Sequence, residues 1–328
     1  MPPPDGQIRV LVTGAGGPAA VSVIKSLRAD PTVELLAADM DPWAAGMYLL
    51  PAGARTLVPA GDDPGFADAV LSTCAAMAVD VLVPTVDSEL RPLAAARAEF
   101  GAAGVELLLA PGPALAVTLD KLALAQRCAP AVRVPRTELV TQTDPGSWEF
   151  PVVAKPRTGS GSRGFRIVPT PAALAGLDEP GGLIVQEYLP GEEYSIDVLA
   201  DADGHVVAAV PRVRVRVDSG VSVAGRTVHD HGLEQLGRQV AAATGITYLA
   251  NVQCRLDRAG RPALLEVNPR VPGTLPLTVA SGIDMPRLAL DSLRGRPIPR
   301  QARFREIAMV RYLDERFVDL TEVRQVVL

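Results

Sequence analysis

The chain has 328 residues, of which 48% are hydrophobic and 4% aromatic, and its formal net charge at pH 7 is −5. This length allows two or three packed lobes, and the acidic balance argues against a nucleic acid as partner. Three cysteines without metal-like spacing exclude a disulfide framework, and no apolar run has membrane-spanning length, so we expect no membrane partner and a cytoplasmic location.

Strands and helices are predicted to alternate over the first hundred residues. Apolar runs predict strands at 9–13, 33–38, 55–58, 79–83 and 105–109, and helices at about 19–29, 66–77 and 89–100. Such alternation predicts a parallel, doubly wound α/β sheet. Functional loops are then expected at the carboxyl ends of the strands.

Two loops of this region carry candidate functional residues. Gly14–Gly17 with Asp39 loosely matches a dinucleotide fingerprint, but the third glycine is missing, which favours a tight turn that shapes a substrate cleft. Asp87 and Glu89 directly follow a predicted strand. They either bind an ammonium group of a substrate or occupy a helix N-terminus, where acidic residues interact well with the dipole.

A glycine-rich loop follows Lys155. The lysine ends the apolar run 150–154, and the loop at 158–164 leads into a second apolar run at 165–168. Glycines let backbone N–H groups converge on a phosphate, and Lys155 supplies a positive charge beside them. A flexible hairpin tip is the alternative. Because the lysine precedes the glycines, the loop is not a P-loop of the common kind. Residues from about 134 to 186 are expected to form a small α/β lid.

The segment that follows the lid combines a strand end with an acidic turn. An apolar run leads into Glu187, the chain turns at Pro190-Gly191, and a second strand begins at Tyr194. Open backbone at such a turn can pair with the edge of an adenine, and a carboxylate just beyond it can hold ribose hydroxyls. An ordinary acidic turn is the alternative.

Three arginines alternate with valines at 212–216. In a strand, Arg212, Arg214 and Arg216 point to the same face. Like charges grouped in this way favour an anionic partner, a phosphate or a substrate carboxylate. An exposed sheet face is the alternative.

The stretch from 251 to 270 has the pattern of a hairpin. If its turn is centred at Ala259-Gly260, Gln253 lies opposite Glu266 and Asn251 lies opposite Asn268. One face then carries amide and carboxylate oxygens, which are ligands that suit Mg²⁺. A bulge would shift this register, and a polar solvent face is the alternative.

These elements, in this order, resemble the ATP-grasp superfamily, in particular the branch related to carbamoyl-phosphate synthase large subunits and the pyrrolysine-biosynthesis ligase. The resemblance covers Val10 to about Leu293, and its most specific part is 251–253 followed by 266–270. It implies an α/β fold in three parts: an N-terminal doubly wound α/β domain at 1–112, a small α/β lid at 113–190 and a larger C-terminal α+β lobe at 191–328.

The resemblance also implies roles for single residues. ATP phosphates would be contacted by Lys121, Lys155, Gly159, Ser160, Gly161 and Ser162. Adenine and ribose would be held by Glu187, Tyr188, Leu189 and Glu193. Magnesium would be held by Gln253, Glu266 and Asn268, of which Gln253 and Asn268 also face the nucleotide. Arg270 would face the transferred phosphate, and the candidate catalytic side chains are Arg270, Lys155 and Arg216.

The function implied is an ATP-dependent carboxylate–amine ligase that forms an amide through an acyl phosphate and releases ADP and phosphate. Its cofactors would be ATP and Mg²⁺, with Mn²⁺ as an alternative metal, and its substrates a small carboxylate and an amine, amino acids among them. A homodimer is one option for its oligomeric state.

Other functions remain open: an acyl-phosphate-forming kinase or carboxylase of the same fold, a non-catalytic nucleotide-binding module, and a nicotinamide-dependent oxidoreductase. Carbamoyl phosphate synthesis is not expected, because the chain is too short for the duplicated synthases and lacks a second arginine near Arg270.

Overall fold

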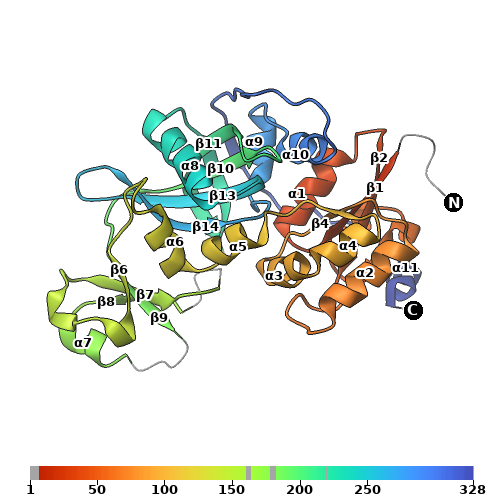
Figure 1. The fold of residues 1–328 in the computed structure, drawn as a ribbon. Helices are drawn as coiled ribbons and strands as arrows, with labels where there is room; N and C mark the ends of the chain where they lie inside the picture. Colours follow the sequence, from red (N-terminus) through yellow and green to blue (C-terminus); the bar gives the residue numbers. More distant parts are fainter. Residues whose placement is uncertain (1–6, 160–163, 178–181, 219, 328) are drawn as a thin grey trace.

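The structure is a computed structural model that describes residues 7–159, 164–177, 182–218 and 220–327. Three of the predicted phosphate-contacting residues lie outside the described residues: Ser160, Gly161 and Ser162. The chain forms an N-terminal α/β domain, a lid and a C-terminal lobe, each built on its own sheet (Figure 1). The predicted α/β class is thereby confirmed.

The N-terminal domain is built on a five-stranded parallel sheet of order β3-β2-β1-β4-β5. Its strands are β1 (Ile8–Thr13), β2 (Val33–Asp39), β3 (Arg55–Leu57), β4 (Val81–Val83) and β5 (Glu106–Leu107). Its helices are α1 (Pro18–Leu27), η1 (Met47–Leu49), η2 (Ala52–Ala54), α2 (Phe66–Ala76), α3 (Asp87–Ala95) and α4 (Arg97–Ala102). The helix predicted at 89–100 is thus two helices, separated at Ala96, where φ is −88° and ψ is 13°.

The strand order reverses between β1 and β4, and this opens a crevice at their carboxyl ends. The buried Glu89 holds the two loops of this crevice together. Its carboxylate accepts hydrogen bonds from the Thr13 hydroxyl at 2.8 Å and from the N–H groups of Thr85 and Val86 at 3.1 and 3.2 Å. Burial raises the pKa of Glu89 to about 7. Glu89 is therefore a structural residue at a helix N-terminus, which is one of the two alternatives given above; the other was binding of a substrate ammonium group.

The lid is a four-stranded antiparallel sheet of order β6-β9-β7-β8. Its elements are β6 (Thr137–Leu139), η3 (Val140–Gln142), η4 (Pro145–Ser147), β7 (Val152–Pro156), β8 (Arg166–Val168), α7 (Pro171–Ala175) and β9 (Leu183–Glu187). It has a small apolar core of its own, made of Trp148, Val152, Ala154, Val168, Leu174 and Val185. The lid is therefore packed around a core separate from that of the other two parts.

The C-terminal lobe is a six-stranded antiparallel sheet of order β14-β13-β10-β11-β12-β15. Its strands are β10 (Glu193–Ala200), β11 (Val206–Asp218), β12 (Val221–Thr227), β13 (Tyr248–Leu256), β14 (Pro262–Asn268) and β15 (Ala308–Val310). Its helices are α8 (His231–Thr244), α9 (Leu275–Ala280) and α10 (Met285–Leu293). Helices α5 (Gly112–Thr118) and α6 (Lys121–Cys128), which the prediction places in the lid, pack against β14 and α8 of this lobe.

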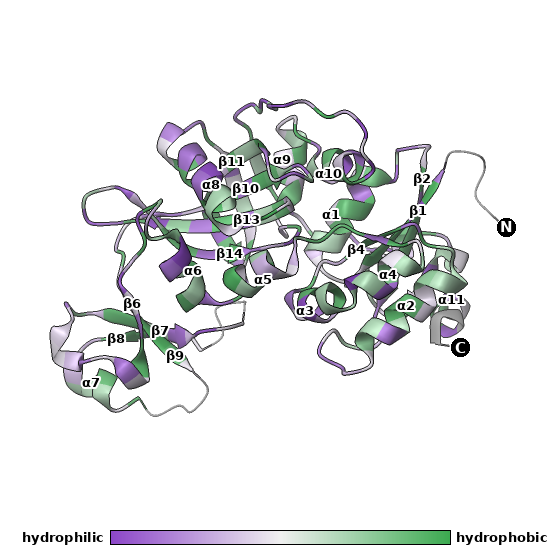
Figure 2. Ribbon diagram, in the orientation of Figure 1, coloured by the Kyte–Doolittle hydropathy of each residue, from purple (hydrophilic) through white to green (hydrophobic). Residues whose placement is uncertain are grey.

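The N-terminal domain and the C-terminal lobe share one continuous apolar core, seen as green strands and helix faces in Figure 2. Helix α1 packs against α9 and α10. The Ser26 hydroxyl donates to Asp284 at 2.5 Å. The last helix, α11 (Leu320–Val327), returns to the N-terminal domain, where Arg55 and Glu322 form an ion pair at 3.0 Å. These two parts therefore share one core, and the lid has its own.

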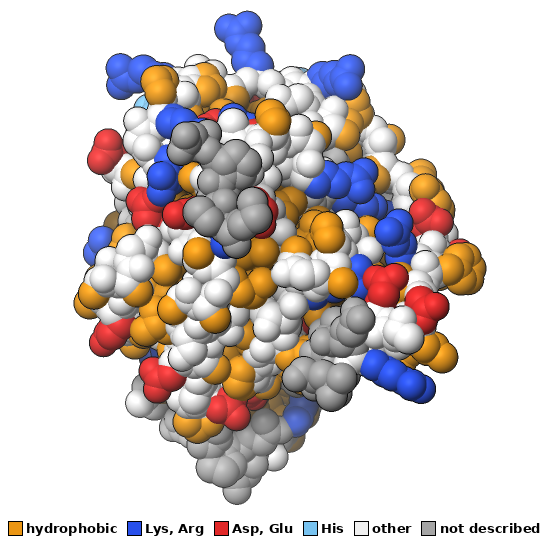
Figure 3. All heavy atoms as spheres, turned by 90° about the vertical axis from the view of Figure 1, so that its right-hand side faces the viewer, with side chains coloured by type: hydrophobic (Ala, Val, Ile, Leu, Met, Phe, Trp, Pro, Cys, Tyr) orange, Lys and Arg blue, Asp and Glu red, His pale blue; other side chains and the backbone are white. Residues whose placement is uncertain are grey.

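Charges are mixed on the surface at the N-terminal domain's end of the molecule. Basic and acidic side chains are interspersed among apolar ones on this face (Figure 3). Within the described residues, every helix is too short or too polar to cross a membrane.

A buried ion pair lies in the middle of the six-stranded sheet. The Asp197 carboxylate binds the Arg212 guanidinium at 2.6 and 2.9 Å, and both side chains are almost fully buried. Asn251 donates to the same carboxylate at 2.8 Å and Thr278 donates at 2.6 Å. With four hydrogen bonds the buried charge is fully compensated.

We predict that Asp197→Ala lowers the free energy of unfolding by about 3–5 kcal/mol, because it leaves the buried Arg212 charge without a partner. Chemical denaturation of the variant, compared with wild type and with Asp203→Ala, measures this change. Asp203 is an exposed residue of the turn before β11 and its replacement should have little effect. Equal denaturation midpoints for the two variants would contradict the prediction.

Candidate active site

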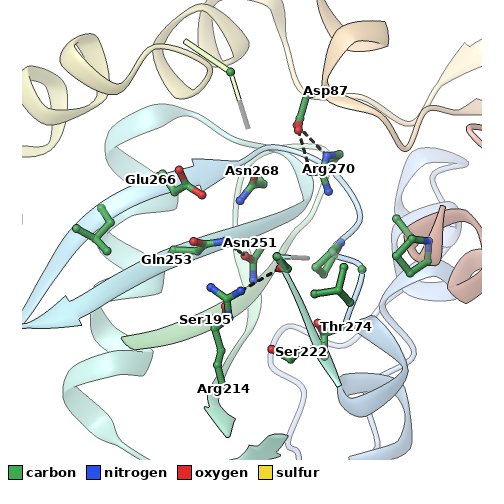
Figure 4. Close-up of a pocket in the computed structure, with 18 of the residues that line it drawn as sticks. Asp87, Ser195, Arg214, Ser222, Asn251, Gln253, Glu266, Asn268, Arg270 and Thr274 are labelled. Atoms are coloured by element: carbon green, nitrogen blue, oxygen red, sulfur yellow. Dashed lines mark hydrogen bonds and ion pairs between the residues drawn. The ribbon is translucent and has the colours of Figure 1, made fainter. Parts of the chain in front are cut away.

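A cavity of about 400 Å³ lies where the N-terminal domain, the lid and the C-terminal lobe meet (Figure 4). Several residues that the sequence selected line it together: Lys121, Lys155, Gly159, Glu193, Gln253, Glu266, Asn268 and Arg270. These residues span about 150 positions of the sequence. Their convergence makes this cavity the candidate active site.

The predicted hairpin register is present in the structure. Gln253 is paired with Glu266 and Asn251 with Asn268. The turn is centred on Ala259 itself, half a residue from the predicted centre, because Leu256 pairs with Pro262. A bulge between Gln253 and Cys254 takes up this offset.

The extra residue of the bulge is Leu265. Cys254 pairs with Leu264, so that Leu265 has no residue opposite it. Side chains normally alternate along a strand, but the bulge lets Leu265 and Glu266 both line the cavity. The cavity therefore has an apolar surface at Leu265 directly beside the Glu266 carboxylate.

The donor set on this hairpin suits a hard cation. The Gln253 amide nitrogen lies 3.4 Å from the Asn251 side-chain oxygen, which leaves the Gln253 carbonyl oxygen directed to the same face as Glu266 and Asn268 (Figure 4). One carboxylate and two amide oxygens, completed by phosphate oxygens and water, are ligands that Mg²⁺ accepts. Among the described residues no three His, Cys, Asp or Glu side chains are grouped to hold a metal. The mixed set is therefore the candidate metal site.

Two lysines form the cationic end of the cavity. Lys121 is the first residue of α6, and its Nζ donates to the Gly159 carbonyl at 2.7 Å. Arg157 binds Asp120, the N-cap of α6, at 2.6 Å, which ties the lid loop to this helix. Burial, opposed by the negative charge of Glu266 and assisted by the positive charge of Lys121, lowers the pKa of Lys155 to about 8. A polyanion that enters the cavity would meet both of these positive charges.

Arg270 forms a bidentate ion pair with Asp87, with both nitrogen–oxygen distances at 2.8 Å (Figure 4). Both residues line the cavity. The pair joins the N-terminus of α3 to the end of β14, so it links the two parts that hold opposite walls of the site. Both residues were predicted as functional candidates from the sequence, but their ion pair with each other could not be predicted.

Other predicted residues lie away from the cavity. Glu187, at the end of β9, binds Arg133 at 2.6 and 2.7 Å, and neither Tyr188 nor Leu189 lines the cavity. Their role at the adenine stays a prediction. Ser160, Gly161 and Ser162 cannot be placed, because they lie outside the described residues.

The three arginines of β11 do not share one environment. Arg212 and Arg214 line the cavity, and Arg214 forms an ion pair with Glu193. Arg216 is exposed and lies outside the cavity, because the register of β11 and β12 shifts between Arg214 and Arg216. The expected common face therefore ends at this irregularity, and the catalytic role of Arg216 has no support from its position.

Some lining residues were missed by the sequence analysis. Ser195, on the neighbouring strand β10, lies opposite Gln253 and lines the cavity. Asp197 lies opposite Asn251 on the same strand, but it is fully buried and does not line the cavity. The alternation of Ser195 and Asp197 with apolar residues was the signal that could have revealed a polar face across two strands. Ser222 and Thr274 line the cavity as well.

Asp39 has a local structural role. Its carboxylate accepts hydrogen bonds from the N–H groups of Gly16 at 2.7 Å and Asp41 at 2.9 Å. The two carboxylate oxygens therefore hold the backbone that follows β1 and the backbone that follows β2. Gly17 lines the cavity, so the turn at Gly14–Gly17 forms part of its wall.

The comparisons with known proteins agree with this architecture. Residues 179–316 match the family model described as ATP-grasp in the biosynthetic pathway with Ter operon, and residues 10–108 match that of the PylC-like N-terminal domain. Together the two matches cover the N-terminal domain and most of the C-terminal lobe. The resemblance to the ATP-grasp superfamily is thereby confirmed.

Solved structures share the fold at low sequence identity. A biotin carboxylase from Campylobacter jejuni matches with a TM-score of 0.74 at 16% identity, covering 89% of this chain and 72% of that chain. An L-amino acid ligase from Bacillus licheniformis matches with a TM-score of 0.68 at 16% identity, covering 89% and 75%. Pyruvate carboxylase from Rhizobium etli matches with a TM-score of 0.74 at 17% identity. The match covers 89% of this chain but only 29% of the pyruvate carboxylase chain. The chain therefore has the ATP-grasp fold.

We predict that the affinity for a magnesium–ATP analogue falls as the pH rises above 8. The Lys155 pKa of about 8 means that the amine is charged below this pH and neutral above it. A polyanion binds the charged form, so the affinity should decrease by about tenfold per pH unit above the pKa. Calorimetric titrations between pH 7 and 9.5 measure this slope.

Lys155→Arg is the matched control for this experiment. A guanidinium remains charged throughout the range, so the slope should disappear even if the affinity at pH 7 is lower. The same slope in wild type and Lys155→Arg would assign the titration to another group.

Proposed function

We propose that the protein is an ATP- and magnesium-dependent ligase that joins a carboxylate to an amine through an acyl phosphate. The observation that carries this proposal is the placement of Gln253, Glu266 and Asn268 on one hairpin face, in the same cavity as Lys121 and Lys155. Metal ligands and cations that converge on one cavity suit a bound triphosphate.

The cavity offers a surface for each part of the nucleotide. Leu265 provides an apolar contact for the base, and Glu193 provides a carboxylate for the ribose. Lys121 and Lys155 would neutralise the phosphates, and Gly159 belongs to the loop that would close over them. Magnesium held by Gln253, Glu266 and Asn268 would withdraw charge from the phosphate oxygens.

The chemistry needs two substitutions and no covalent protein nucleophile. A carboxylate oxygen of the substrate attacks the γ-phosphorus, the bond from this phosphorus to the β,γ-bridging oxygen breaks, and ADP leaves. The amine nitrogen then attacks the acyl carbon, the carbon–oxygen bond to phosphate breaks, and the amine loses a proton to solvent or to a carboxylate of the cavity. Positioning and charge stabilisation account for most of the catalysis in such transfers.

Arg270 and Asp87 would change partners during this reaction. A substrate carboxylate has the same shape and charge as the Asp87 carboxylate, so it can take its place on the Arg270 guanidinium. The released Asp87 then faces the cavity and can hold the incoming amine as an ammonium or accept its proton. Closure of the lid, which has its own core, would exclude water from the acyl phosphate.

A second candidate is a carboxylase in which bicarbonate is the acid that is phosphorylated. It is favoured by the carboxylases among the structures that share the fold. The two candidates differ in the acid that stimulates ATP turnover, so bicarbonate and organic acids are tested separately.

We predict that a screen of amino acids and small acids, with and without amines, yields ADP and phosphate from ATP. The cations and the metal ligands would be arranged for attack at the γ-phosphorus. Quantifying ADP, AMP, phosphate and pyrophosphate in each reaction checks this. Stoichiometric AMP and pyrophosphate would contradict the proposal, and turnover with bicarbonate alone would favour the carboxylase.

We predict that Glu266→Ala lowers the magnesium-dependent ATP turnover by more than about 100-fold, since even residues that only orient metal ligands contribute up to this factor. The melting temperature should change little, because Glu266 is half-buried and lines the cavity. Glu99→Ala, at an exposed position in α4, is the matched control. Near-wild-type turnover in Glu266→Ala would place the metal site elsewhere.

A further inference from the structure

Three hydroxyl groups in the wall of the cavity have no hydrogen-bond partner among the described residues. They belong to Ser195, Ser222 and Thr274, which are 4%, 3% and 6% exposed. Figure 4 shows Ser222 and Thr274 at the end of the cavity away from Glu266. The residues are buried as a whole, but their oxygens are open to the cavity, because none of them belongs to the buried side-chain atoms without a partner. Hydroxyls that line a cavity and have no partner in the described part of the protein are free to bind a polar ligand inside it.

The N-terminus of helix α1 forms part of the cavity wall as well. Gly17, Pro18 and Ala19 line the cavity. Gly17 is the N-cap, it has no side chain to accept a hydrogen bond, and the first turn contains no acidic residue. The Ala19 N–H has no acceptor within the helix, and the helix dipole places positive potential at this end.

This helix end lies directly against the segment that carries Thr274. A methyl group added at Gly273 would be 3.2 Å from the Pro18 ring and 3.8 Å from Val221, the neighbour of Ser222. The α1 N-terminus and the segments that carry Ser222 and Thr274 are therefore neighbours in the wall of the same cavity.

Arg311 adds an uncompensated positive charge behind this space. It is half-buried and its guanidinium donates to the Gly273 carbonyl. Among the described residues no carboxylate forms an ion pair with it. Burial lowers the pKa of Arg311, and the nearby charge of Arg212 lowers it further. Arg212 is itself neutralised by Asp197, so it offers no negative charge to Arg311.

The other acidic groups of the cavity are already engaged. Asp87 binds Arg270, and Glu193 binds Arg214. Glu266 lies at the metal end, beside Lys155. A cation that is partly buried without a counter-ion favours an anion at this place.

We propose that Ser222, Thr274 and the N-terminus of α1, with Arg311 behind them, form an anion subsite that binds a second anionic group of the carboxylate substrate. This inference rests on the proposed function, because the first anionic group is the carboxylate that is activated beside Arg270. Thr274 follows Arg270 by four residues, and both line the same cavity of about 400 Å³. The substrate class is then a dicarboxylic acid or a phosphorylated carboxylic acid.

The test measures anion binding when the nucleotide site is full. Wild-type protein is saturated with magnesium and a non-hydrolysable ATP analogue, and calorimetry then records the titration of inorganic phosphate and, separately, of succinate. We expect at least one of the two anions to bind. Stronger binding of phosphate identifies a phosphorylated substrate, and stronger binding of succinate identifies a dicarboxylate.

Variants assign the binding to the subsite. Arg311→Gln and the double variant Ser222→Ala, Thr274→Val should each weaken the anion at least tenfold, with unchanged affinity for the nucleotide analogue. The double variant keeps the test valid if Arg311→Gln fails to fold. The control is Arg316→Gln. Arg316 is exposed and lies five residues after Arg311, so this variant should bind the anion as tightly as wild type does.

Two outcomes overturn the inference: neither anion binds to the saturated wild-type protein, or the subsite variants bind as tightly as Arg316→Gln. Failure of the proposed function has a different signature. It would appear in the first step of the experiment as absence of nucleotide binding. The comparison of Arg311→Gln with Arg316→Gln can then still be made with phosphate alone.

Discussion

The buried carboxylate of Asp197 is the group on which the geometry of the site depends. It accepts four hydrogen bonds, from Arg212 at 2.6 and 2.9 Å, Asn251 at 2.8 Å and Thr278 at 2.6 Å. A charge in the interior is tolerated only with such compensation, so these groups must keep their positions whenever the lobe is folded. They connect β10, β11, β13 and α9, and they leave the neighbouring Gln253 facing the cavity.

Around this fixed network, most charged groups of the cavity are held by partners that a ligand can replace. Arg270 is bound to Asp87 across two parts of the molecule, and the Lys121 amine is bound to a lid carbonyl. Such contacts keep a cationic cavity stable before ligands arrive, and they preserve the orientation of each group. Arg311 differs, because its charge has no acidic partner among the described residues, and this difference motivates the anion subsite.

Much of the site could be predicted because its central motif is local. Gln253 and Glu266 are brought together by a single hairpin, whose register follows from strand alternation and a short turn. Even there the turn is half a residue off, and the Leu265 bulge restores the pairing. Lys155 was recognisable for a similar reason, since it stands directly beside a glycine-rich loop in the sequence.

The sequence by itself determined the order of elements, the parallel sheet of the first domain and the face shared by Gln253, Glu266 and Asn268, because these depend on periodicity over a few residues. Only the tertiary structure decided which charges meet. Asp87 and Arg270 are 183 positions apart, the β11 irregularity separates Arg216 from the cavity, and Thr274 lines the same cavity as residues from distant segments. Such contacts depend on how sheets and helices pack against one another, and local patterns carry no information about that packing.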